Sequence, residues 1–214
     1  MIAILVGAAS GAAMAVAGEV ALRVLPARVE EALEQPPWTR SVARPPVMEL
    51  VGAAVGAAAG ARVGWHPALA PALALCGLLV VITFIDIGHR IIPNVLVLPG
   101  TALALALWAI VDLHAVPVHV AGAAIGFVAF LVLALVSPGG MGLGDVKLAL
   151  MLGAFLGLGV VVATLASFLL SLVPVLLIVL VRGWRVGRKV TLPFGPFLAA
   201  GGLVALLTGA APIL

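Results

Sequence analysis

Residues 148–181 read LALMLGAFLGLGVVVATLASFLLSLVPVLLIVLV and contain no charged side chain. A helix that crosses a hydrocarbon core of about 30 Å needs about 20 apolar residues, so this stretch is long enough for one full span and a second, shorter one. Gly157-Leu158-Gly159 interrupts it, and glycine weakens a helix interior. We therefore expect a short or partly re-entrant helix over about 147–158, followed by a full span that ends near Val181.

Apolar stretches of this kind recur along the whole chain. Hydrophobic residues make up 64% of the sequence and charged residues only 9%, whereas a soluble domain carries about a quarter charged residues. Such a chain cannot cover itself with polar surface, so we expect lipid to be its solvent and residues 1–214 to form a single integral membrane domain. The other predicted spans are 2–22, 47–63, 68–87, 94–111, 118–136 and 192–211.

The basic residues predict the topology of these spans. With eight segments and both termini outside, every one of the 11 Lys and Arg residues except Arg62 falls in a predicted cytoplasmic loop, as the positive-inside rule requires. If 148–181 were one span, the basic loop 182–189 would face outward. The sequence thus predicts an all-α, polytopic protein with about eight transmembrane helices. These loops account for the net charge of +3, which therefore does not indicate a nucleic-acid partner.

Small residues on the second span predict how it packs. Gly52, Gly56 and Gly60 recur every four residues. This spacing places them on one face of a helix, where small side chains let two helix backbones approach closely. We expect a packing role for these glycines rather than a catalytic one.

Asp86 and Asp145 stand out among the 8 acidic residues. An ionised Asp at the centre of a membrane costs about 2.5–3.5 kcal/mol on insertion scales. The other acidic residues lie in polar loops, near the ends of spans or in a first helical turn, where water or a helix N-terminus stabilises them. Asp86 ends an apolar span, and Asp145 lies between a glycine-rich stretch and an apolar helix. The predicted topology places both at the cytoplasmic edge of the membrane.

Two interpretations of this pair are open from the residues alone. Two carboxylates that meet can share one proton, so that one acts as a base on water and the other as an acid, as in aspartic proteases. Alternatively, the two are interfacial aspartates that pair with Arg90 and Lys147. His89 lies three residues from Asp86 and either hydrogen-bonds to it or is an interfacial histidine without a catalytic role.

The glycine-rich stretch 139–144 places bare backbone directly before Asp145. Its four glycines predict a non-helical segment. Gly142 and Gly144 would let a peptide or another helix approach closely, and would free amide donors to hold a carboxylate or a substrate carbonyl. The alternative is an ordinary loop before a helix that Asp145 caps.

Three motifs together resemble the type IV prepilin peptidase family, whose members are GxGD membrane aspartic peptidases. The motifs are Asp86 with the following Ile92-Pro93-Asn94, then Gly142-Leu143-Gly144-Asp145-Val146-Lys147, and then Pro193-Phe194-Gly195-Pro196-Phe197. The resemblance covers nearly the whole chain. It implies an eight-helix membrane aspartic endopeptidase with Asp86 and Asp145 as its catalytic pair. The residues that would shape the loop and the substrate approach are Gly142, Gly144, Lys147, Pro93 and Asn94.

The resemblance also implies partners, a location and a second activity. The substrate would be a prepilin or pseudopilin precursor, whose short basic leader is cut before a hydrophobic helix at the cytoplasmic face of the bacterial inner membrane. Proteolysis would need no cofactor, whereas N-methylation of the new N-terminus would use S-adenosylmethionine. Many members bind zinc through two Cys-x-x-Cys pairs in the first cytoplasmic loop. Here the shortened loop 23–46 has no cysteine, and Cys76 is the only one in the chain, so we expect no metal site.

Two other classes of protein remain open at this stage. A small cation- or proton-coupled transporter would also explain two aspartates in an apolar chain, but it gives no reason for the glycines beside Asp145. An intramembrane peptidase of presenilin type would share Gly-x-Gly-Asp. The absence of a Tyr-Asp pair and the short chain argue against it.

Overall fold

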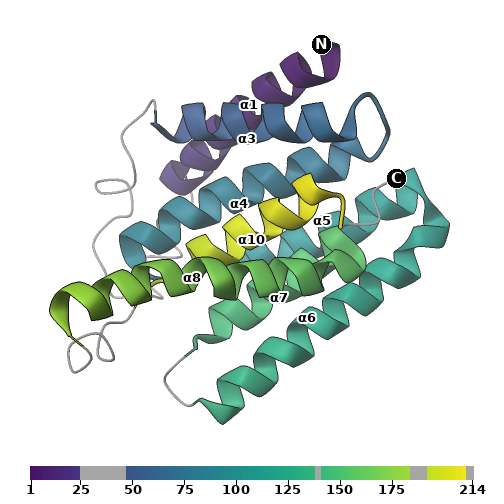
Figure 1. The fold of residues 1–214 in the computed structure, drawn as a ribbon. Coiled ribbons are helices and arrows are strands. Elements are labelled where there is room, and N and C mark those ends of the chain that lie inside the picture. The colour runs from purple at the N-terminus through teal and green to yellow at the C-terminus, as the bar shows by residue number, and fades with distance from the viewer. Residues whose placement is uncertain (25–46, 138–140, 184–191, 211–214) are drawn as a thin grey trace. The chain divides into compact units, whose positions relative to one another are not determined.

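The computed structural model describes residues 1–24, 47–137, 141–183 and 192–210 (Figure 1). Every regular element in these residues is a helix, so the predicted all-α class is confirmed. The chain divides into two compact units, Met1–Ile91 and Ile92–Ile213. Most of the predicted loops 23–46 and 182–189 lies outside the described residues.

The described helices include 4 apolar stretches long enough to cross a membrane, namely Leu69–His89, Asn94–Val111, Leu113–Val136 and Leu143–Val181. The chain is therefore a polytopic membrane protein. Shorter apolar helices occur at Ile2–Met14 and Gly195–Thr208. The predicted total of eight spans and the outside location of both termini stay predictions.

The first unit begins with two helices that pack backbone against backbone. They are α1 (Ile2–Val24) and α3 (Val47–Val63). A Cβ on Gly56 would collide with the backbone of Gly7, and one on Gly60 would collide with the backbone of Ala3. The predicted packing role of the glycines on the second span is confirmed, since only glycine leaves the space for this approach.

The third helix of this unit carries the first candidate carboxylate. Helix α4 (Leu69–His89) follows the turn at Gly64, where φ is +69°. Most of its side chains are buried, and Gly77 packs against the side chain of Met14 from α1. The helix runs two residues beyond the predicted end at residue 87, because Arg90 closes its last turn in a left-handed conformation.

The second unit contains the remaining helices. They are α5 (Asn94–Val111), η2 (Leu113–Ala115), α6 (Val116–Val136), α7 (Leu143–Leu156), η3 (Gly157–Gly159), α8 (Val160–Arg182) and α10 (Gly195–Thr208). Helix α7 packs along α6 and also contacts α5 and α10 (Figure 1). The helix that carries the second candidate carboxylate therefore has three helices of its own unit around it.

The predicted break in the long apolar stretch is confirmed. Helix α7 ends at Leu156, and α8 begins at Val160 after the short turn η3. Gly157 has φ +55° and ψ −134°, a backbone conformation that side chains with a Cβ rarely adopt. Gly157 and Gly159 are both buried, as non-helical backbone at membrane depth must be.

Two predicted helix starts are wrong by three or four residues, at α7 (143 rather than about 147) and at α10 (195 rather than 192). The glycine-rich stretch is not wholly outside the helix, because α7 begins at Leu143 and includes Gly144 in its first turn. Glycine costs little there, since the first amides of any helix lack a partner within the helix. The last helix begins at Gly195 rather than at residue 192, with Pro196 in its first turn, where the missing proline N–H removes no helical hydrogen bond.

Candidate active site

Asp86 lies in the last turn of α4, in the first unit. Its exposed fraction is 4%. The backbone N–H of Arg90 donates to the Asp86 carbonyl oxygen at 2.8 Å. Arg90 has φ +56°, and in the described part of the chain it is the non-glycine residue with a positive φ. This uncommon conformation stops the helix one turn beyond Asp86 and turns the chain toward Ile92 and Pro93.

Asp145 lies in the first turn of α7, in the second unit. Its side chain is half-buried. Its Oδ2 accepts a hydrogen bond from the Gly142 backbone N–H at 3.3 Å, and its own N–H donates to the Gly142 carbonyl at 3.1 Å. A carboxylate at a helix N-terminus is also stabilised by the aligned peptide dipoles. The predicted hydrogen bond from a glycine amide to this carboxylate is therefore present. It lies at the start of the helix rather than in a separate loop.

The start of α5 lies against the start of α7 within the second unit. Lys147 Nζ donates to Asn94 Oδ1 at 2.9 Å. A Cβ added to Gly144 would lie 3.0 Å from the Ile92 Cβ, so this glycine lets the two segments meet. Pro93 is the residue before α5, with φ −70° and ψ 128°. The structure thus brings Asn94 and Lys147 together at the start of α7, next to the first turn that contains Gly144 and Asp145. Pro93 lies there as well, because it directly precedes Asn94.

The third motif forms an aromatic cluster in the second unit. The ring centroid of Phe194 lies 5.3 Å from that of Phe168 and 6.2 Å from that of Phe130. The ring centroids of Phe194 and Phe197 are 6.5 Å apart. Gly195 is buried at the start of α10. This irregular backbone is therefore covered by side chains of α6 and α8, as its place in an apolar chain requires.

Substituting alanine for the two motif glycines is expected to give unequal effects. Gly144→Ala places a Cβ against the Ile92 side chain, and we expect a net loss of about 1 kcal/mol of unfolding free energy, since overpacking outweighs the gain in helix propensity. Gly142→Ala has an ordinary conformation (φ −81°, ψ 149°) and its nearest contact is 3.6 Å, so we expect no change. Unfolding in detergent measures both. A larger loss for Gly142→Ala would contradict the placement of these two residues.

The protein is an α-helical integral membrane protein. One aspartate lies in the last turn of α4, and another lies in the first turn of α7. The chain belongs to the type IV leader peptidase family, whose model matches residues 73–180 and so includes Asp86 and Asp145. Asp86 belongs to the first unit and Asp145 to the second.

Curated relatives support this assignment. The chain is 36% identical over 138 residues to the prepilin leader peptidase/N-methyltransferase of Stutzerimonas stutzeri, covering 61% of this chain and 47% of that protein. It is 35% identical over 133 residues to the protein of the same name from Bacillus subtilis, covering 62% and 53%. The Aeromonas salmonicida protein of that name is 34% identical over 179 residues, covering 78% and 59%.

The chain spans about half the length of the first two of these relatives. No solved structure matches it. The comparisons do not support the cation- or proton-coupled transporter alternative.

Proposed function

We propose that this protein is a membrane aspartic endopeptidase that removes the basic leader from prepilin or pseudopilin-like precursors, with Asp86 and Asp145 as its catalytic pair. The observation that carries the proposal is the family match over residues 73–180, which contains both aspartates in one continuous region. In this proposal the two units form one integral membrane peptidase domain of the bacterial inner membrane, and the shortened loop 23–46 lies in the cytoplasm.

The proposed chemistry uses the two carboxyl groups in complementary protonation states. The ionised one takes a proton from water, and the resulting hydroxide adds to the scissile carbonyl carbon. The protonated one gives its proton to the amide nitrogen as the C–N bond breaks. Because the leader is polar and basic while the following helix is apolar, aspartates at the cytoplasmic edge would let the helix stay in lipid while the scissile bond meets water.

Residues next to the proposed pair would fix its surroundings. The Gly142 amide holds the Asp145 carboxylate, and the Lys147–Asn94 hydrogen bond holds the start of α7 against the start of α5. We propose that Gly142, whose missing side chain would meet no atom closer than 3.6 Å, leaves room for the extended substrate backbone, and that Gly144 shapes the approach by letting Ile92 pack against α7. Lys147, Pro93 and Asn94 would keep that approach in a fixed shape.

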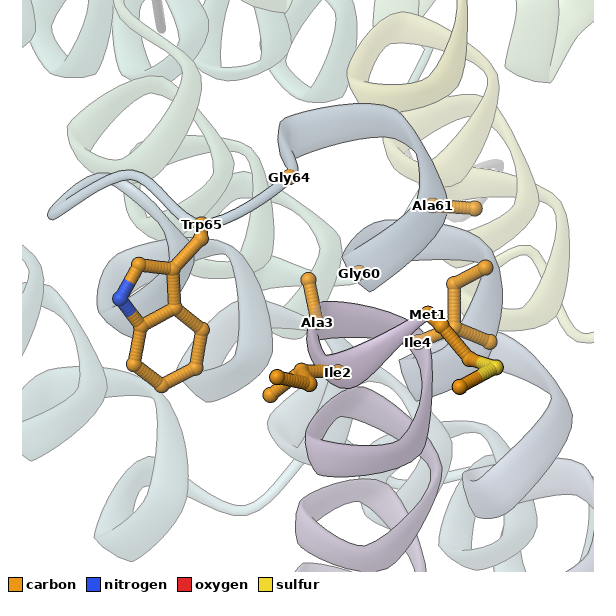
Figure 2. Close-up of a pocket in the computed structure, with 8 residues that line it drawn as sticks. All are labelled: Met1, Ile2, Ala3, Ile4, Gly60, Ala61, Gly64 and Trp65. Carbon is orange, nitrogen blue, oxygen red and sulfur yellow. The ribbon is translucent and has the colours of Figure 1, made fainter.

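N-methylation of the new N-terminus is a second candidate activity, because the relatives' names include N-methyltransferase. It would require S-adenosylmethionine. The first unit has an open pocket of about 720 Å³ between the start of α1 and the end of α3, lined by Met1, Ile2, Ala3, Ile4, Gly60, Ala61, Gly64 and Trp65 (Figure 2). None of the side chains in this lining is charged, so they offer no partner for the charged amino-acid end of that cofactor, and we derive no methyl-transfer step.

Cleavage of a defined precursor tests the proposed function. The full chain, purified in detergent, is incubated with a precursor that has a basic leader before an apolar helix, and the products are identified by intact mass. We expect one cut between leader and helix. Adding S-adenosylmethionine to the same reaction would show methylation as a further mass increase of one methyl group. A precursor that stays intact with well-folded protein would contradict the peptidase assignment.

A further inference from the structure

Helix α7 is too short to cross the membrane. Its 14 residues span about 21 Å at 1.5 Å per residue, against a hydrocarbon core of about 30 Å. Because the charged Asp145 lies in its first turn, α7 should begin at an edge of the membrane. A helix of this length that begins at one edge ends inside the membrane. The last carbonyl groups of any α-helix have no partner within the helix, and in lipid no water replaces the missing donors. The end of α7 needs hydrogen-bond donors from elsewhere in the protein.

Two buried side chains supply these donors. Trp108 of α5 donates from Nε1 to the Phe155 carbonyl at 3.0 Å. His119 of α6 has its Nδ1 3.0 Å from the Ala154 carbonyl. Trp108 is 3% exposed and His119 is 0% exposed. Consecutive carbonyls at the end of α7 are thus bonded by side chains from two different helices.

The two rings also hold each other. Their centroids are 4.0 Å apart with an interplanar angle of 21°, so they are stacked. A carbonyl oxygen can only accept, which means that the His119 Nδ1 carries the proton. Its Nε2 is buried without a hydrogen-bond partner in the described part of the chain. Among the described residues, the polar contact that accounts for this buried histidine is therefore the one with α7.

Close packing beside these rings fixes the same end of α7. A Cβ on Gly122 of α6 would collide with the backbone of Gly157, and one on Gly153 would collide with the backbone of Gly122. The helix end thus lies directly on the α6 backbone. It has no freedom to slide along α6 without breaking either the two hydrogen bonds or this contact.

We infer that Trp108 and His119 are positioning residues that cap the C-terminal end of α7 within the membrane and thereby set the depth of Asp145 at its other end. This inference rests on the proposed function of Asp145. A rigid helix transmits a displacement of one end to the other, and a misplacement of about 1 Å in a catalytic group can cost a hundredfold in rate.

Three variants test this inference. His119→Phe keeps the ring and its stacking but loses the donor, whereas His119→Asn loses the ring and keeps an amide donor at the position of Nδ1. Trp108→Phe likewise removes the donor on α5 and keeps an aromatic ring. We expect His119→Phe and Trp108→Phe to lower kcat on a precursor by about tenfold to hundredfold with KM unchanged, and His119→Asn to recover most of kcat.

Hydrogen exchange supplies a readout that does not depend on activity. We expect faster exchange at the Gly157 amide, which closes the last turn of α7 on the Gly153 carbonyl, in both Phe variants but not in His119→Asn. Unchanged exchange would overturn the cap, and faster exchange with unchanged kcat would overturn the positioning role. If the unmodified protein leaves the precursor intact, the proposed function and the positioning role fail together, while exchange still decides whether the pair caps α7.

Discussion

Asp86→Asn and Asp145→Asn are each expected to abolish precursor cleavage while the helical fold is retained. Asparagine has nearly the shape of aspartate but cannot exchange a proton at neutral pH, so the base or the acid of the proposed pair is lost. General acid–base catalysis contributes about 10²–10⁴-fold, and we expect a loss of at least that size in kcat. Initial rates by intact mass, with a thermal unfolding curve for each variant, measure the two effects separately.

A matched control exists for the second of these substitutions. Asp112 Oδ1 accepts from the His114 backbone N–H at 2.9 Å, which is the same kind of local contact that Asp145 makes with Gly142. Asp112→Asn, in the turn between α5 and α6, should leave kcat unchanged. Cleavage that persists at the unmodified rate in both catalytic variants would exclude the aspartate pair. An equal loss in Asp112→Asn would trace the effect to folding instead.

The second large effect is expected at the crossing of α6 and α7. Gly122→Ala and Gly153→Ala each put a methyl group where the backbone of the facing segment lies, so the helices must separate. We expect each to lower the free energy of unfolding by about 3 kcal/mol, the upper end for overpacking, because backbone cannot rotate away as a side chain can. Since the separation would move α7 with Asp145, we expect activity to fall as well. Equilibrium unfolding in mixed detergent measures the first quantity.

Additivity distinguishes this mechanism from a general intolerance of larger residues. The two glycines face each other across one crossing, so the double variant should cost clearly less than the sum of the single variants. Ala124→Leu, on an exposed face of α6, is the control and should leave unfolding unchanged. Full additivity, or an equal loss in Ala124→Leu, would show that the close approach of these backbones is not what holds α7.

Most helix positions could be predicted from the sequence, because each span has to satisfy its own backbone hydrogen bonds in lipid. The bounds of α3 and α5 agree with the predicted 47–63 and 94–111. The break at Gly157–Gly159 was also predictable, since those glycines interrupt an apolar stretch too long for one span. The prediction was wrong at Gly144, where a first helical turn tolerates glycine better than a helix interior does.

The candidate residues Asp86 and Asp145 follow from the sequence and stay a prediction, whereas the contacts around them could not be predicted. Asp86 and Asp145 stood out because charge is rare in this chain. The Lys147–Asn94 hydrogen bond joins residues far apart in sequence, so no local sequence pattern predicts it. No role is assigned to Trp108 or His119 from the sequence, although a polar donor within an apolar span indicates that a buried acceptor needs it.

By itself, the sequence determined that the chain is a helical membrane protein, roughly where most of its helices lie, and that Asp86 and Asp145 are the carboxylates that an apolar chain explains least well. These properties depend on each segment and its solvent. Only the tertiary structure decided that the α6 and α7 backbones touch and that Trp108 and His119 serve the carbonyls of α7, because such contacts depend on the rotation and depth of whole helices, which no single segment encodes.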